Sequence, residues 1–343
     1  MAAAPTAVPP HRFAVATTLS SGYPVAAIVV QDRVYDLPTT SSRVAAEENE
    51  PSFLDLRVAQ VQTLLDRWES ASPLLAALAR VLCEEDKSYL SPVPLHDALL
   101  LSPVPSPGKM VNVGLNYRDH AAEMGLIINE DTFAPNFFLK GDRNCIIGPC
   151  QPICVSSPYV DWEAELAVII GKTARNVAPE EAMEYVAGFT CHNDVTDRRK
   201  MMKPDGGLDF FGGKSRDSFA PLGPYLVPRD LVPEPGHLRI RCLVNGRVMQ
   251  DTTTANMLWG VERCLAFASS CSTLQPGDVL ALGTGSGTGW AKGLKGEHSL
   301  AALIDNLESG GGVFLRPGDT IEVEIEKIGS LKNNVVDNRE CAA

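Results

Sequence analysis

The sequence lacks the features of membrane and nucleic-acid-binding proteins. Its longest apolar stretches, such as 166–170, are the length of a strand, whereas a membrane-spanning helix needs roughly 18 apolar residues. Positive charge is scarce, because 30 Lys and Arg stand against 42 Asp and Glu in 343 residues, for a net charge of −12. Nucleic acids and anionic membranes bind basic surfaces. We therefore expect neither as a partner.

Cysteine pairs at CxxC spacing are also absent. The nine cysteines are scattered, so a zinc ribbon or a thioredoxin-like site has no support, and we expect a reducing compartment. Residues 1–13 have no apolar core behind a basic start, which predicts a flexible leader of a cytoplasmic protein rather than a secretory signal. A mitochondrial transit peptide is the alternative, because residues 1–30 contain no acid.

The chain length favours about two domains. Short strands are expected within 11–38, and apolar residues at helical spacing predict one broken helix or two within 58–82. The segment 91–110 carries five prolines and reads as an extended linker. Beyond it the pattern is mostly that of strands, with helices expected at 179–189 and 254–270. We therefore predict a small α+β domain with its linker at 1–107 and a larger β-rich α+β domain at 108–343.

Acidic residues enter an apolar strand in the segment 159–172. Side chains two apart share one face of a strand, so Asp161, Glu163 and Glu165 are expected on one face. Buried acids need a partner, and Glu163 and Glu165 together with Asp194 would form an oxygen-only site for Mg²⁺, Mn²⁺ or Ca²⁺. The alternative is an edge strand whose acidic side chains are solvated. Because His192 lies two residues from Asp194, a mixed nitrogen and oxygen site also stays open.

Two further segments carry candidate chemistry. His120 and Glu123 are one helical turn apart, so the carboxylate could orient the imidazole as a general base; a surface pair is the alternative. The glycines of 282–293 match neither GxGxxG nor GxSxG, which argues against a dinucleotide site and a nucleophile elbow. The exposed amides of this loop, with Thr284, could hold a carboxylate.

These features, in this order, resemble the fumarylacetoacetate hydrolase family, in particular its acylpyruvase and domain-containing members. The resemblance covers nearly all of 108–335, through the segments 114–123, 137–140, 161–172, 193–194, 212–224, 244–251, 274–285 and 315–335. It implies a mixed β-sandwich or barrel-like catalytic fold that buries a divalent metal, in a homodimer, with a small-molecule 2-oxo acid or β-diketone as substrate.

The resemblance also assigns roles residue by residue. It implies Glu163, Glu165 and Asp194 as metal ligands, with Mg²⁺ expected first and Mn²⁺ or Ca²⁺ as alternatives. His120 and Glu123 would activate water, and Lys214 would stabilise an enolate. The substrate would be held by a further group of side chains, namely Arg118, Lys140, Gln250 and Thr284.

The function implied first is hydrolysis of a C–C bond in an acylpyruvate-like substrate, through a metal-chelated enolate. Decarboxylation or tautomerisation of a 2-oxo acid such as oxaloacetate, on the same site, is the alternative. A catalytically silent binding protein is the third possibility, although such a protein has no reason to bury unpaired acids.

The sequence departs from the family pattern around the expected pocket. Met201 stands where the family carries a glutamine that belongs to small-diacid pockets. Gly141, Asp142 and Arg143 replace the usual proline and serines, and 283–289 replaces the usual Gly-Thr-Pro. From these changes we expect a larger or less acidic substrate than oxaloacetate.

Overall fold

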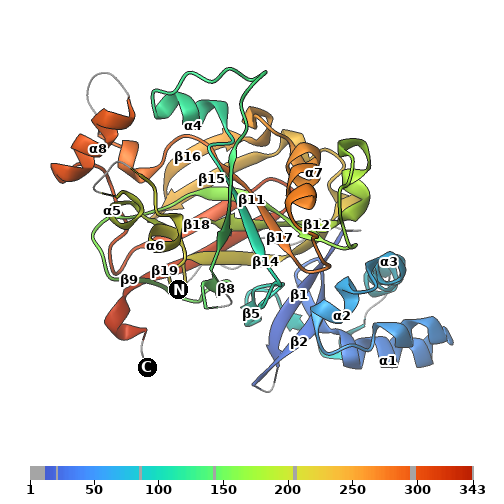
Figure 1. Ribbon diagram of the computed structural model, residues 1–343. Coiled ribbons are helices and arrows are strands. Elements are labelled where there is room, and N and C mark those ends of the chain that lie inside the picture. Colours follow the sequence, from blue (N-terminus) through green and yellow to red (C-terminus); the bar gives the residue numbers. More distant parts are fainter. Residues whose placement is uncertain are drawn as a thin grey trace.

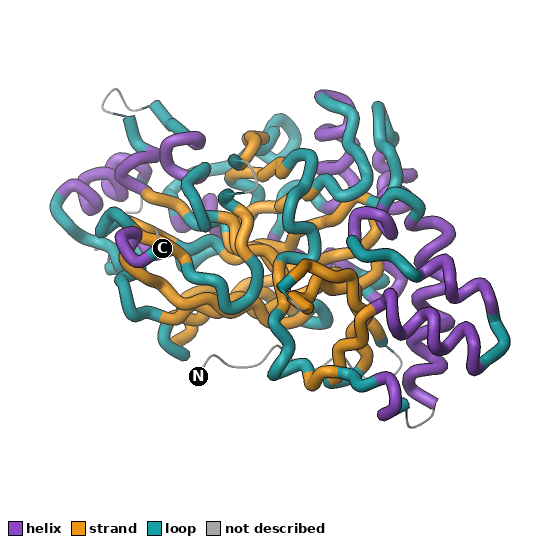
Figure 2. Tube along the Cα trace, turned by 90° about the horizontal axis from the view of Figure 1, so that it is seen from below, coloured by secondary structure: helices purple, strands orange, loops and turns teal. Residues whose placement is uncertain are grey.

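The computed structural model describes residues 12–20, 22–84, 87–141, 144–203, 207–293 and 299–341. Residues 1–11 of the leader expected at 1–13, and Asp142 and Arg143, lie outside these ranges, whereas Phe13 already belongs to the first strand. Within them no helix is long and apolar enough to cross a bilayer. Figure 1 shows the amino-terminal elements gathered beside a larger β-rich body, and in Figure 2 the helices of that part cluster at one end of the molecule.

The amino-terminal part combines a small meander with helices, as the sequence predicts. Its strands pair in the order β4-β3-β2-β1, and β5 also pairs with β1. Leu64, Leu65, Leu75 and Leu78 lie at helical spacing and are fully buried. The elements are β1 (Phe13–Ser20), β2 (Tyr23–Val30), β3 (Arg33–Asp36), α1 (Leu37–Glu47), η1 (Pro51–Leu56), α2 (Val61–Leu65), α3 (Trp68–Glu84), η2 (Ser88–Leu90), β4 (Val93–Pro94) and β5 (Leu100–Leu101).

The larger part is built on the strands that the sequence predicts. Its first half holds β6 (Met110–Gly114), α4 (Arg118–Glu123), β7 (Asn136–Lys140), β8 (Ile146–Ile147), β9 (Ile153–Val155), β10 (Val160–Asp161), β11 (Ala164–Ile170), η3 (Pro179–Tyr185), β12 (Val186–Asn193), β13 (Thr196–Asp197), α5 (Arg198–Met201) and α6 (Phe210–Lys214). Its second half holds β14 (Ala220–Pro228), η4 (Arg229–Leu231), η5 (Pro235–His237), β15 (Arg239–Val244), β16 (Arg247–Thr253), η6 (Thr254–Asn256), α7 (Val261–Cys271), β17 (Val279–Thr284), η7 (Gly289–Ala291), α8 (Leu300–Glu308), β18 (Thr320–Ile325), β19 (Gly329–Asp337) and η8 (Asn338–Glu340).

Two packed sheets carry the site. The large sheet runs β4-β3-β2-β1-β14-β12-β11-β17-β6-β7, and the second runs β16-β15-β18-β19-β9. The described strands do not close into a barrel, so the fold is an α+β arrangement of open sheets. Residues of β11, such as Leu166 and Val168, are fully buried and share one apolar cluster with Ile240 and Val323 of the second sheet. This packing buries the middle of the large sheet, where the acidic residues lie.

The large sheet also crosses the domain boundary predicted after residue 107. β1 pairs antiparallel with β14, with Val15 opposite Leu226, and Leu226 and Ile169 belong to the amino-terminal apolar cluster. The two parts therefore share backbone hydrogen bonds and a core. The boundary itself stays a prediction.

Local departures from the predicted elements have simple causes. The helix expected at 179–189 is a 3-10 helix that ends at Tyr185, and the remaining residues extend β12 because they are buried on both faces of the sheet.

Cys154 and Cys341 form a disulfide that ties β9 to the residue after η8, with their Cα atoms 6.2 Å apart. Disulfides persist mainly in oxidising environments, so the expectation of reduced thiols does not hold for this pair.

Candidate metal centre and active-site cavity

Three acidic side chains meet at the centre of the large sheet. Glu165 lies on β11, while Glu163 lies in the break between β10 and β11. Asp194 directly follows β12, and its N–H donates to the Glu163 carbonyl at 2.9 Å, so the two strands deliver it beside Glu163. One carboxylate oxygen from each of the three residues lies within 4.8 Å of the others, and all three residues are buried.

Asp161 does not join this group, contrary to the strand pattern. The strand breaks at Trp162 and Glu163, so the two-residue periodicity is lost and Asp161 turns elsewhere. Its carboxylate accepts from Arg198 Nε at 2.8 Å and from the N–H groups of Gly289 and Trp290 at 2.6 and 3.1 Å. It therefore links α5 to the glycine-rich loop.

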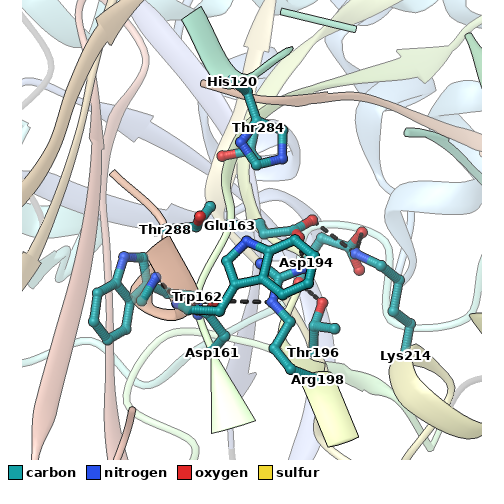
Figure 3. A network of polar contacts seen from close by, with 12 residues as sticks. His120, Asp161, Trp162, Glu163, Asp194, Thr196, Arg198, Lys214, Thr284 and Thr288 are labelled. Carbon is teal, nitrogen blue, oxygen red and sulfur yellow. Dashed lines mark hydrogen bonds and ion pairs between the residues drawn. The ribbon is translucent and has the colours of Figure 1, made fainter. Parts of the chain in front are cut away.

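Basic side chains contact two of the three acids, Glu163 and Asp194, and Figure 3 shows Arg198 and Lys214 beside them. Lys214 Nζ donates to Glu163 Oε2 and to Asp194 Oδ2, both at 2.7 Å, and Arg198 Nη1 lies 2.7 Å from Glu163 Oε1. Lys140 Nζ also donates to Asp194. Burial raises the pKa of Asp194, but the charges of Lys140 and Lys214 outweigh burial and hold the pKa below its ordinary value.

Glu165 has no basic partner in the part of the chain that the structure describes. Among the described residues, its carboxylate accepts a hydrogen bond from the Gly283 N–H at 3.0 Å. Burial raises the pKa of Glu165 well above its ordinary value, and the charges of Asp194 and Glu163 raise it further. A divalent cation would relieve this repulsion, and an oxygen-only ligand set suits Mg²⁺, Mn²⁺ or Ca²⁺. The residues present therefore fit a hard divalent metal.

His192 does not belong to the group, so a mixed nitrogen and oxygen site is not formed. Its Nδ1 lies 2.9 Å from the Pro221 carbonyl oxygen and its Nε2 lies 3.3 Å from Asn112 Nδ2. Burial, together with the charge of Lys140, lowers the pKa of His192 to about 3. The neutral ring thus donates to Pro221, accepts from Asn112, and supports the sheet behind the acids.

His120 and Glu123 form the predicted pair on α4. His120 Nδ1 lies 3.0 Å from Glu123 Oε2. Glu123 also accepts from the Gly287 N–H at 2.7 Å and from Thr288 Oγ1 at 3.0 Å, which fixes its carboxylate against the glycine-rich loop. Burial raises the pKa of Glu123, but the hydrogen bond and charge of His120 and the bonds from the loop give a net lowering. Glu123 therefore stays ionised and orients the imidazole.

A cavity of about 170 Å³ lies between His120 and two of the three acids, Glu163 and Glu165. It is small compared with the roughly 300–1,000 Å³ of drug-sized pockets. His120, Glu163, Glu165, Lys214 and Thr284 all line it. The remaining lining is largely apolar and includes Met124, Leu126, Met201, Leu208 and Phe210.

Three of the four side chains expected to hold substrate lie outside this lining. Arg118 is part-exposed and pairs with Glu130 on the surface. Lys140 lies behind Asp194, where it also donates to the Val195 carbonyl at 3.2 Å. Gln250 is saturated, since its Oε1 accepts from the Ala164 N–H and its Nε2 donates to Thr284 and to Gly285. Lys140 thus supports Asp194 and Gln250 supports the glycine-rich loop, and of the four side chains only Thr284 lines the cavity.

Arg198 and Trp290 line the cavity without having been predicted. Arg198 follows the expected metal ligand Asp194 by four residues. A basic residue so close to a metal ligand is the signal that could have identified it. Trp290 follows Gly289 in the glycine-rich segment. A large aromatic side chain among glycines is a signal that the residue lines a cavity. Of the altered residues at the expected pocket mouth, Met201 lines the cavity, whereas Gly141 packs beside Cys145 and Ser215.

The chain combines a buried acid triad, its lysine and arginine partners and a histidine–glutamate pair in one open-sheet α+β fold. This combination defines a class of enzyme that acts on small molecules. Residues 109–336 match the family model described as fumarylacetoacetate (FAA) hydrolase, C-terminal. The chain therefore belongs to the fumarylacetoacetate hydrolase family.

Named relatives include two mitochondrial oxaloacetate tautomerases. The Xenopus laevis protein is 38% identical over 239 residues, covering 69% of this chain and 68% of that protein. The Homo sapiens protein FAHD2A is 35% identical over 277 residues, covering 80% of each. These comparisons extend the family assignment beyond the matched domain.

Solved structures agree with the fold. The fumarylacetoacetate hydrolase of Exiguobacterium antarcticum is 29% identical with a TM-score of 0.69, over 95% of this chain and 99% of that chain. Maleylpyruvate hydrolase of Sphingobium sp. SYK-6, in complex with manganese(II) and pyruvate, is 25% identical with a TM-score of 0.66, over 94% and 99% of the two chains.

Proposed function

We propose that this chain is a divalent-metal-dependent enzyme that interconverts the keto and enol forms of a 2-oxo acid, with oxaloacetate as the first substrate to test. The observation that carries the proposal is the buried triad of Glu163, Glu165 and Asp194 with Lys214 against two of its members. The names of the relatives favour tautomerisation over the C–C hydrolysis that the sequence analysis put first. Decarboxylation on the same site belongs to the same proposal.

The three carboxylates would hold Mg²⁺, Mn²⁺ or Ca²⁺, which when bound supplies Lewis-acid stabilisation of negative charge on substrate oxygens. Manganese in the structure of the Sphingobium maleylpyruvate hydrolase supports a divalent ion. Lys214 keeps a fixed positive charge beside the same region, because burial lowers its pKa but the charges of Asp194 and Glu163 give a net increase. Its ammonium group is therefore placed to stabilise an enolate as the charge develops.

His120 is the group that can move the proton. With Nδ1–H donated to Glu123, Nε2 carries no proton and can accept one from the carbon next to the 2-oxo group. The C–H electron pair then forms the C=C bond, and the carbonyl π pair moves onto the 2-oxo oxygen. Return of the proton to that oxygen gives the enol. Proton transfer by a positioned histidine contributes about 10²–10⁴-fold to a rate. We therefore assign His120 as the acid–base group and Glu123 as its positioning residue.

The test follows the loss of enol absorbance of oxaloacetate with Mg²⁺ or Mn²⁺, for the wild type and for His120→Gln. The proposal predicts a fast metal-dependent reaction and a decrease of about 10²-fold or more in kcat for H120Q. Enol loss at the uncatalysed rate in the wild type would overturn the proposal.

Hydrolysis of an acylpyruvate is the second candidate. The observation that favours it is the His120–Glu123 pair, with the imidazole facing the cavity, because the same nitrogen could deprotonate a water. The structural relatives named as hydrolases agree with this chemistry. Product analysis decides between the two, since hydrolysis of acetylpyruvate releases acetate and pyruvate, whereas tautomerisation releases neither.

We further propose that the metal-bound protein is a homodimer in the mitochondrion. The two oxaloacetate tautomerases are named as mitochondrial proteins, whereas the sequence alone favoured the cytoplasm, and the homodimer is part of this proposal. Imaging of the full chain with a carboxyl-terminal fluorescent tag, with and without residues 1–11, tests the compartment. Light scattering on the purified chain tests the oligomeric state.

A further inference from the structure

The glycine-rich loop at 282–293 binds acids of the chain itself. Three of its backbone N–H groups each donate to a carboxylate of the same chain, namely Gly283 to Glu165 at 3.0 Å, Gly287 to Glu123 at 2.7 Å and Gly289 to Asp161 at 2.6 Å. These three amides are therefore not free to hold the carboxylate of a ligand, as the sequence suggested. The loop instead fixes side chains that surround the cavity.

Thr288 adds a side-chain hydroxyl to these contacts. It is fully buried, and its Oγ1 donates to Glu123 Oε2 at 3.0 Å. The same Oε2 lies 3.0 Å from His120 Nδ1. Thr288 does not belong to the described residues that line the cavity. It therefore reaches the reaction only through Glu123.

Two hydrogen bonds from the loop fix the plane of the Glu123 carboxylate. The last torsion of a glutamate side chain is broad, so one bond from the Gly287 N–H to Oε1 leaves the carboxylate free to rotate. The Thr288 hydroxyl binds the other oxygen. With both oxygens held, Oε2 stays opposite Nδ1 of His120, keeps the proton on that nitrogen and leaves Nε2 as the acceptor.

The loop is itself held in place where Thr288 lies. Gly287 has a φ of 100°, and a Cβ at this position would clash with the Met249 carbonyl oxygen of β16. On its other side, Ser286 Oγ donates to Asp119 Oδ2 at 3.3 Å. The loop thus contacts α4 near its beginning, at Asp119, and at its end, at Glu123. Thr288 therefore donates from a backbone that cannot easily move.

We propose that Thr288 is a positioning residue of the acid–base pair. Its hydroxyl holds Glu123 so that His120 keeps a single tautomer, with Nε2 ready to take the proton of the substrate. This inference rests on the proposed function, because it adds a residue to the mechanism given there.

The test compares variants that remove or keep the hydroxyl. Thr288→Val removes the hydroxyl and keeps the size of the side chain, and Thr288→Ser keeps the hydroxyl. Thr190→Val is the matched control, because Thr190 is also fully buried, lies on β12 and has a hydroxyl without a partner among the described residues. If T288V does not fold, Thr288→Ala lacks the same hydroxyl and carries the same expectations.

The first readout is steady-state kinetics with oxaloacetate and Mg²⁺. In T288V, kcat should fall about tenfold, which is the value of one hydrogen bond to a charged group. KM should stay within about twofold of the wild type, because Thr288 does not line the cavity. T288S should recover kcat to within about threefold of the wild type, and T190V should match the wild type.

The second readout is the tautomer of His120, measured by NMR of the full chain with ¹⁵N-labelled histidine. The chain has six histidines, and the signal of His120 is the one missing from H120Q. At about pH 8, where an unperturbed imidazole is neutral, the wild type and T288S should show the Nδ1–H tautomer alone. T288V should show a mixture of both tautomers.

The NMR readout needs no turnover, so it separates this inference from the proposed function. A wild type that does not act on oxaloacetate counts against the proposed function, and the tautomer alone then decides the role of Thr288. Where turnover is found, the proposal requires both changes in T288V, and either one without the other overturns it. A T288S variant as impaired as T288V indicates packing, and a rise in KM without a fall in kcat indicates substrate contact; each overturns the proposal.

Discussion

Replacing Glu165 by glutamine tests the metal centre through stability as well as activity. In the metal-free chain Glu165 is buried beside two other acids, and burial followed by their charges raises its pKa well above its ordinary value of 4.5. Because the group prefers its proton when folded, folding is penalised as pH rises above the ordinary pKa. The penalty is absent below that pH and grows until the folded pKa is reached.

The size of the effect follows from two estimates. At about 1.4 kcal/mol per pH unit, the rise from 4.5 to pH 7 bounds the penalty at about 3 kcal/mol. Coulomb repulsion between two carboxylates at the 4.8 Å limit of the triad, with an effective dielectric constant of about 20, is also about 3 kcal/mol, and Lys214 offsets part of it. We therefore expect E165Q, without metal, to be more stable than the wild type by about 1–3 kcal/mol at pH 7.

The assay is thermal and urea unfolding of the chelated and Mn²⁺-loaded proteins. Metal should raise the melting temperature of the wild type, because an ion that binds only the folded chain stabilises it by mass action, and should do little for E165Q. The advantage of metal-free E165Q should shrink toward zero as pH falls to about 4.5. Glu262→Gln, an exposed position on α7, serves as the control and should stay within about 0.5 kcal/mol of wild type. A metal-free E165Q that is less stable than the wild type, or one that Mn²⁺ stabilises equally, would refute the reasoning.

Three further predictions concern neighbouring groups. Lys214→Met should cost about 2–3 kcal/mol in the metal-free chain, because Glu163 and Asp194 lose their shared cation while Arg198 and Lys140 still pair with them; urea unfolding that shows no loss contradicts the ion-pair geometry. The same variant, loaded with metal, should lose about 10²-fold or more in kcat, and a kcat near wild type would remove the lysine from the mechanism. Cys150 is exposed whereas burial raises the pKa of the Cys191 thiol, so alkylation of the native protein followed by mass spectrometry should label the first and spare the second; rapid labelling of both contradicts the burial.

The fold was largely predictable because apolar periodicity and turn residues specify local structure. Gly277 and Gly318 lie in Pro-Gly-Asp segments at 276–278 and 317–319 and take positive φ values of 87° and 95°, two residues before β17 and β18 begin. Pairing between distant strands leaves no such local mark. The contact of β1 with β14, and the disulfide between Cys154 and Cys341, join residues that lie about 200 positions apart, and nothing in the local sequence specifies either.

The site was predictable where the resemblance named a residue and not where its orientation mattered. Glu163, Glu165 and Asp194 come together as expected, whereas Asp161, which strand periodicity places on the same face as the two glutamates, pairs with Arg198 and the glycine-rich loop. The backbone breaks after β10, and a break in a strand has no signature in a pattern of alternating residues. Lys140 illustrates the same limit, because whether a lysine faces the cavity or the back of an acid depends on the register between β6 and β7. In both cases the sequence identifies the residue but does not specify the direction of its side chain.

The most direct test of a metal-dependent tautomerase is the rate of enol loss from oxaloacetate as Mn²⁺ is titrated into the chelated chain. The account predicts no acceleration above the uncatalysed rate without metal, full activity at one Mn²⁺ per chain, and no activity at any Mn²⁺ concentration for E165Q. Full activity in the chelated wild type, or a normal titration curve for E165Q, would contradict the claim that Glu163, Glu165 and Asp194 hold the catalytic metal.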